Sequence, residues 1–178
     1  MNNALFDPAP DFDQPIAVLK HCHEKIRKQL KTLEKLSTHL PEFGANLDAK
    51  QGAIAILRYF NEAAPKHHAD EEDDLMPMLQ STATGEDAIR LHALMPEILQ
   101  ELRQMEALWE NLAQHLRQIS EGDNVELSDD AVKQFVRLYT LHMEKEEANI
   151  APMAKKLFSA AQMAQLGQAM RSRRGIDH

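Results

Sequence analysis

The stretch that decides the fold, "HHADEEDDLMPM", runs from His67 to Met78, and a second version, "HMEKEEANIAPM", runs from His142 to Met153. Each copy begins with a histidine, has a glutamate four residues later and another directly after it, and reaches a Pro-Met pair ten residues after the histidine. Residues four apart lie on the same face of a helix. The repeat therefore predicts two helices that present the same His–Glu pair.

Around both copies, apolar residues recur at alternating intervals of three and four, which is typical of a helix packed in a bundle. The pattern extends over four long segments, which are separated by "PEFGAN" from Pro41, "STATGED" from Ser81 and "SEGDNVELSDD" from Ser120. Four amphipathic helices with short connections predict an all-α fold, an antiparallel up-down four-helix bundle.

The predicted bundle covers residues 15–158, with an N-terminal arm at 1–14 and a short C-terminal helix and tail at 159–178. Asp13 is expected to cap the first helix, and Pro15 suits its first turn.

Composition limits the classes of protein. The chain has 178 residues, of which 43% are apolar and 27% charged, as in an ordinary globular domain. The net charge of −8 argues against nucleic-acid or anionic-membrane partners, and no apolar run approaches the roughly 20 residues of a membrane span. The N-terminus lacks a secretory signal pattern, and the single cysteine, Cys22, cannot form an internal disulfide. These features predict a cytoplasmic protein.

In both repeats the His–Glu pair replaces two apolar residues on the face that should point into the core. An ionised carboxylate in an apolar core costs several kcal/mol unless another charge compensates it. No lysine or arginine occupies the inward positions of the four helices, so a bound cation is the predicted compensation. Histidine nitrogens with bridging carboxylates suit iron, manganese or zinc. We expect the acidic run "DEEDD" to be mostly solvated, and we do not place Glu72 or Glu147 among the metal ligands. We expect His68 to lie behind the ligands or at the surface.

The segments "HEKI" at His23, "HHADEEDDLMP" and "HMEKEEANIAP" together resemble the hemerythrin-like (HHE cation-binding) domains, and the resemblance covers nearly the whole chain. It implies a four-helix bundle with two non-haem irons bridged by carboxylates, which binds O₂ or responds to oxygen, nitric oxide or iron. The implied metal ligands are His23, His67, Glu71, His142 and Glu146. Both glutamates would bridge the two irons, and zinc and manganese remain alternatives to iron.

The third helix departs from the family pattern. The family places a histidine where this chain has Leu102. His92 lies ten residues earlier, about 15 Å along a helix, so the ligand is not assigned to it. Glu97 and Glu101 stand at the edge of the inward face and could reach the site. One metal would therefore have fewer nitrogen ligands than the other and bind less tightly.

Three classes of function remain open. The resemblance favours a binding or sensing protein for O₂ or NO that acts in oxidative or nitrosative stress or in iron homeostasis. The alternatives are an enzyme that reduces peroxide or NO or oxidises ferrous iron, and a bundle whose site is degraded or holds zinc. Tyr139, one turn before His142, could hydrogen-bond a ligand or simply pack in the core.

Overall fold

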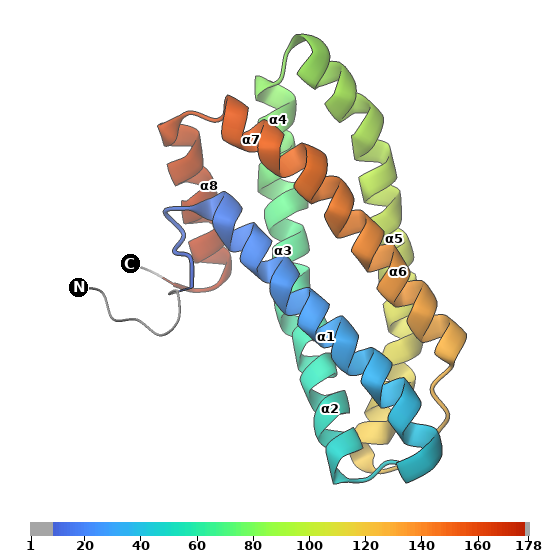
Figure 1. Ribbon diagram of the computed structural model, residues 1–178. Coiled ribbons are helices and arrows are strands. Elements are labelled where there is room, and N and C mark those ends of the chain that lie inside the picture. Colours follow the sequence, from blue (N-terminus) through green and yellow to red (C-terminus); the bar gives the residue numbers. More distant parts are fainter. Residues whose placement is uncertain (1–8, 177–178) are drawn as a thin grey trace, which may run out of the picture.

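The computed structural model describes residues 9–176, and all regular secondary structure in that range is helical (Figure 1). The first long segment is α1 (Pro15–Phe43). The second is continuous and comprises α2 (Leu47–Arg58), the π-helical η1 (Tyr59–Ala63), α3 (Ala64–Ala69), the π-helical η2 (Asp70–Leu75) and α4 (Met76–Thr82). The third is α5 (Gly85–Glu121). The fourth comprises α6 (Asp129–Lys145), the π-helical η3 (Glu146–Ile150) and α7 (Ala151–Leu157), and α8 (Ala160–Arg173) follows.

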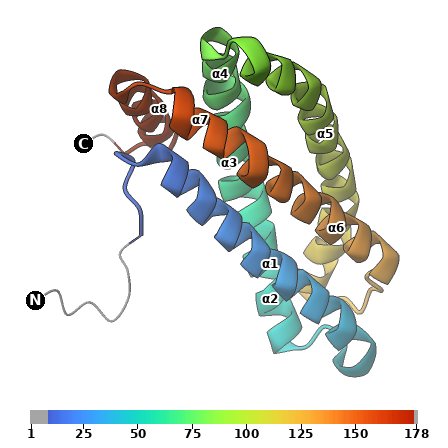
Figure 2. The ribbon, with the colours of Figure 1, turned by 45° about the horizontal axis from the view of Figure 1, so that its top comes forward.

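The four long segments form a bundle in which each packs against the next along the chain. α1 contacts α2, α2 contacts α5, α5 contacts α6, and α6 returns against α1. Successive segments are joined at alternating ends of the bundle (Figures 1 and 2). The prediction of an all-α bundle is confirmed. Within the described range, every helix is too short or too polar to cross a membrane.

The helix starts follow from local capping chemistry. The side chain of Asn46 accepts a hydrogen bond from the backbone of Ala49, and Ser128 accepts one from Ala131. Pro15 occupies the first turn of α1, as predicted. Asp13 does not cap it, because Gln14 takes the capping position and its side chain makes no capping bond.

Each π-helical segment is followed within two residues by a proline: Pro65, Pro77 or Pro152. Proline has no N–H, and its ring clashes with the carbonyl four residues earlier, which in all three cases belongs to the π turn. The backbone relaxes by widening. The N–H after each turn bonds to the fifth residue back, as from Met76 to Glu71 and from Ala151 to Glu146. The prolines of the repeated phrase thus contribute to the wide turns that carry the two glutamates.

The wide turns also explain the spacing of the buried residues. His67, Glu71, Leu75 and Leu79 are buried at three successive intervals of four. A regular helix has 3.6 residues per turn, so such a series would drift around its surface. A π turn holds more residues than an α turn and keeps the series on one face.

The apolar core is divided into two clusters with the polar pairs between them. On α1, Leu19 belongs to one cluster and Ile26 to the other, and His23 lies between them. On the second segment, Ala64 and Leu75 are in different clusters on either side of His67 and Glu71. The fourth segment repeats the order, with Tyr139 in one cluster, Ile150 in the other, and His142 and Glu146 between them. A single polar layer therefore crosses the bundle.

The chain before α1 packs on α8. A Cβ atom on Gly167 would lie 2.0 Å from the carbonyl oxygen of Phe12, so glycine permits this close approach. Arg171 forms ion pairs with Asp13 at 2.8 Å and Asp11 at 3.4 Å. Residues 1–8 of the predicted arm lie outside the described residues, and the division of the chain into arm, bundle and tail stays a prediction.

Candidate metal centre

The structure brings all five predicted metal ligands into the polar layer. His23 comes from α1, His67 from α3, Glu71 from η2, His142 from α6 and Glu146 from η3. Each is at most 4% exposed to solvent. Five helical elements, on three of the four long segments, thus contribute to one buried polar layer.

The carboxylate oxygens lie between the histidine rings. Oε1 of Glu71 is 3.2 Å from Nε2 of His67 and 3.6 Å from Nε2 of His23. Glu146 uses its two oxygens on different sides, with Oε2 at 3.3 Å from Nε2 of His23 and Oε1 at 3.1 Å from Nε2 of His142. Each oxygen of Glu146 thus faces a different histidine. A carboxylate that bridged two metal ions would be arranged in the same way.

The donor set fits metal ions. One ligand atom each from His23, His67, Glu71 and Glu146 lies within 4.8 Å of the others. His23 Nε2, His142 Nε2, Glu71 Oε2 and both oxygens of Glu146 are buried without a hydrogen-bond partner. Buried polar atoms are normally paired, so unpaired nitrogen and carboxylate atoms gathered in one layer fit a bound cation. Nitrogen and carboxylate donors together suit iron, manganese or zinc.

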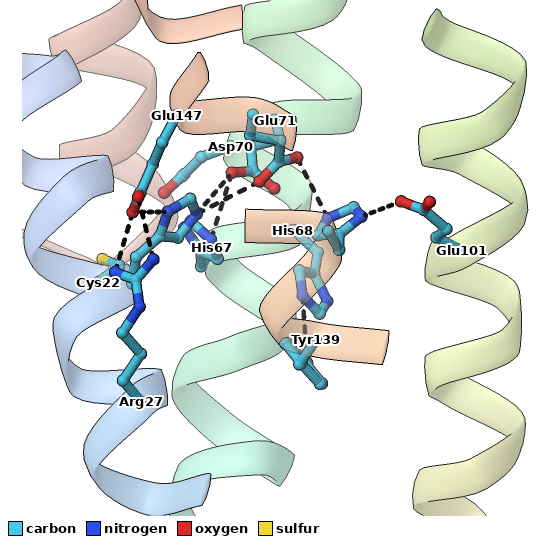
Figure 3. Close-up of polar contacts among 12 residues, drawn as sticks. Cys22, Arg27, His67, His68, Asp70, Glu71, Glu101, Tyr139 and Glu147 are labelled. Carbon is cyan, nitrogen blue, oxygen red and sulfur yellow. Dashed lines mark hydrogen bonds and ion pairs between the residues drawn. The ribbon is translucent and has the colours of Figure 1, made fainter. Parts of the chain in front are cut away.

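His23 is held from behind by a charged pair. Its Nδ1 is 2.9 Å from Oε1 of Glu147, and Arg27 donates to both oxygens of that glutamate, each at 2.9 Å (Figure 3). Such a contact fixes the orientation of a ligand ring and strengthens it as a donor. The sequence assigned Glu147 no place among the ligands, and it lies on the Nδ1 side of the His23 ring, away from Nε2. Its contact with His23 was not predicted. The signal was present in the sequence, because adjacent glutamates on a helix point in directions roughly 100° apart.

His142 has its own charged support from the third helix. Its Nδ1 is 3.0 Å from Oε2 of Glu101, and Lys145 lies 2.5 Å from the other oxygen of Glu101 and 2.9 Å from Glu97. Glu101 therefore contacts the far side of the ring and not Nε2, which faces Glu146. Glu97 does not reach into the site, because its side chain is 61% exposed and paired with Lys145.

Leu102 is buried in the apolar core, and α5 runs unbroken through Pro96. His92 is exposed, as expected of a residue too far along the helix to act as a ligand. The side with His142 therefore has one histidine, whereas the other side has His23 and His67.

His68 points away from His67 toward Tyr139. Its Nε2 lies 3.2 Å from the Tyr139 hydroxyl, and the two rings stack with centroids 5.8 Å apart (Figure 3). Burial, with the positive charge of nearby His142, lowers the pKa of His68 to about 4, so the ring is neutral at pH 7. The pair lines a cavity of about 320 Å³ between the second segment, α5 and α6. His68 thus lies outside the group of ligands, as expected.

Without metal, the ligands hold protons on one another. Burial alone would lower the pKa of His23 and of His142, but the carboxylates outweigh it and raise these pKa values to about 10 and about 9. Burial and the charge of Glu146 raise the pKa of Glu71 to about 8. Burial lowers the pKa of His67 well below its usual range. At neutral pH the metal-free site is therefore partly protonated.

Comparison with known proteins agrees with this geometry. The hemerythrin HHE cation binding domain model matches residues 14–154. The chain belongs to this family. An uncharacterized protein of Haemophilus influenzae is 26% identical over 165 residues, which cover 93% of this chain and 92% of the relative. Family membership implies that the cluster of histidines and glutamates binds a metal ion.

Replacing either central glutamate tests the assignment of ligands. Glu71→Ala or Glu146→Ala removes a carboxylate that faces histidines on separate elements, so bound metal should fall from about two ions per chain toward one or none. Metal content by elemental analysis, with helicity by circular dichroism, measures this. Glu72→Ala, which removes only a contact to exposed Arg103, is the matched control. Full metal content in either alanine variant would show that the glutamate is not a ligand.

The raised pKa values predict the pH dependence of metal binding. Binding must displace protons from His23, His142 and Glu71, so the affinity should increase as the pH rises from about 6 to about 9. An unperturbed histidine site would instead reach its plateau just above pH 6.5. Anaerobic competition for ferrous iron against a chelator of known affinity, repeated at each pH, gives the profile. A flat profile above pH 7 would contradict the proton competition described here.

Proposed function

We propose that this protein is a non-haem di-iron protein that binds or responds to O₂ or NO in the cytoplasm, in oxidative or nitrosative stress or in iron homeostasis. The observation that carries the proposal is the pair of buried glutamates, whose oxygens converge with three histidine nitrogens without any lysine or arginine among them. Glu71, Glu146 and the three histidines would hold the ions, which in the ferrous state would supply electrons to a small bound molecule. The protein's own contribution is to hold the ions apart from bulk water and to fix the histidine rings.

The access route supports a small ligand with little charge. A cavity of about 420 Å³ reaches His23, Glu71 and Glu146 from the side of α1 and α7. Its walls are mostly apolar and include Ile16, Leu19, Leu75 and Ile150, whereas Lys20 and Lys155 are exposed. An apolar passage admits O₂ or NO readily and disfavours charged metabolites, which would lose their hydration.

One observation favours an enzyme on the same centre. The His142 side offers fewer nitrogen donors, and a metal with an open coordination position can activate a substrate. Peroxide or NO reduction and ferrous iron oxidation are the reactions to test. A degraded or zinc-filled site is the third alternative.

The proposed function predicts a change in colour on exposure to air. Protein purified without oxygen and loaded with two ferrous ions per chain should be nearly colourless. Air should then produce the visible absorption of a di-iron(III) centre, and NO should produce a different spectrum. The Glu146→Ala variant is the control because it should not hold both ions. Protein that holds only zinc, or holds iron without responding to O₂ or NO, would exclude the proposal.

The uneven donor set predicts unequal metals. The ion near His23 and His67 should be released slowly, and the ion near His142 quickly. Leu102→His adds the nitrogen donor that the family has on the third helix, so it should slow the fast phase and make the two rates more alike. Release of iron to a chromogenic chelator, followed over time, measures both phases. Two equally slow phases in the natural protein would contradict the inequality. His92→Ala, at an exposed position, should leave both phases unchanged.

A further inference from the structure

A second buried carboxylate lies directly beside a predicted metal ligand. Asp70 precedes Glu71 on η2 and is 0% exposed. Its two oxygens do not face the histidines. Instead they accept hydrogen bonds from Arg173 and Arg174, at the end of α8 (Figure 3 shows Asp70 beside Glu71). An aspartate buried to this degree requires such pairing, because an unpaired buried charge is strongly destabilising.

The contacts to Asp70 are short and directional. Nη1 of Arg173 is 2.5 Å from Oδ1 of Asp70, and Nη2 of Arg174 is 2.6 Å from Oδ2. A second nitrogen of Arg174 donates to Oδ1 at 3.1 Å. Both oxygens of Asp70 are thus engaged by planar guanidinium groups, whose geometry restricts the carboxylate in position and rotation.

Arg173 also reaches along the turn. Its Nη2 is 2.7 Å from Oδ2 of Asp74, so one side chain connects Asp70 and Asp74. These aspartates are the first and the fifth residues of η2, and Glu71 lies between them in the sequence. A wide π turn is less regular than an α turn. The contacts of Arg173 with Asp70 and Asp74 restrict the rotation of this turn. Glu71 would move with such a rotation.

The end of α8 is itself anchored. Leu166 and Met170 are fully buried against the core cluster that contains Leu75. Arg174 donates to the carbonyl of Met170, and its guanidinium lies 5.5 Å from the centre of the Phe12 ring. Arg174 is therefore fixed by contacts other than the one it makes with Asp70, and the end of α8 is fixed by the packing of Leu166 and Met170.

We propose that Arg173 and Arg174 are positioning residues of the metal centre, which act through Asp70 to hold the turn that presents Glu71. The inference rests on the proposed metal-binding function, because Glu71 must be a ligand for its position to matter. It assigns α8, which contributes no ligand, a role in how tightly metal is held. Residues behind metal ligands typically change metal affinity by about 10–100-fold when they are removed.

The chain provides a closely matched control. Arg171 is on the same helix, and its side chain is 24% exposed, compared with 22% for Arg173. Its ion-pair partners are Asp11 and Asp13, which are 71% and 77% exposed and lie in the segment before α1. Arg171→Gln therefore removes one cation from α8 without touching Asp70.

The test compares R173Q/R174Q, R173K/R174K and R171Q, each loaded anaerobically with ferrous iron and challenged with a chromogenic chelator. R173Q/R174Q should release iron about tenfold faster or more. R173K/R174K, which keeps the charge without the planar fork, should be intermediate. R171Q should match the natural protein. The thermal midpoint of each metal-free protein separates loss of metal from loss of fold.

Equal release rates in R173Q/R174Q and the natural protein would overturn the inference, as would an equally large effect in R171Q. If R173Q/R174Q does not fold, Asp74→Asn replaces it, because this change removes one contact at a carboxylate that is 24% exposed and leaves Asp70 paired. It should accelerate release several-fold, and an unchanged rate would overturn the inference. Failure of the natural protein to bind iron would instead refute the proposed function, so the two failures are distinguishable.

Discussion

The burial of two carboxylates in one apolar core is the constraint on which the rest of this structure depends. Each buried ion costs several kcal/mol relative to water unless other charges and hydrogen bonds compensate it. Glu71 and Glu146 are only 3% and 4% exposed, and their immediate neighbours are histidines. Without metal, protons on His23, His142 and Glu71 offset these charges. A metal ion of the kind that the family binds would take the place of those protons, so the polar layer is built to hold positive charge.

The charges do not stop at the ligands. Behind His23 are Glu147 and Arg27, and behind His142 are Glu101 and Lys145. From the centre toward the surface, each histidine is followed by a glutamate and then by an arginine or lysine. Charges of opposite sign thus lie next to each other, which limits the net charge that is buried. Asp70 and the arginines of α8 form a third series beside Glu71. The centre is thus supported from α1, α5, α6 and α8, and not only from the helices that carry the repeated phrase.

The backbone is adapted to the same constraint. Prolines 77 and 152 follow the wide turns that carry the glutamates, and these turns keep residues four apart on one inward face. Pro96 has no such effect, since α5 remains a single α-helix. A proline is therefore one contribution to the wide turn and does not produce it alone. The two halves of the site share this device but differ in donors, because Leu102 stands where the third helix would supply a nitrogen.

The sequence by itself determined the helical class, the breaks between the long segments and the five residues that converge in the polar layer. Local periodicity is sufficient for these, because the spacing of apolar and polar residues within one helix decides which residues share its inward face. The resemblance to the hemerythrin-like domains, and not the periodicity, marked Leu102 as the position where the third helix lacks a histidine. Only the tertiary structure decided which charges stand behind the ligands. Glu147, Glu101 and Asp70 find their partners on other helices, up to 124 residues away in the chain for Glu147 with His23. No periodicity within a helix encodes such pairs, because they depend on how the helices are rotated and packed against one another.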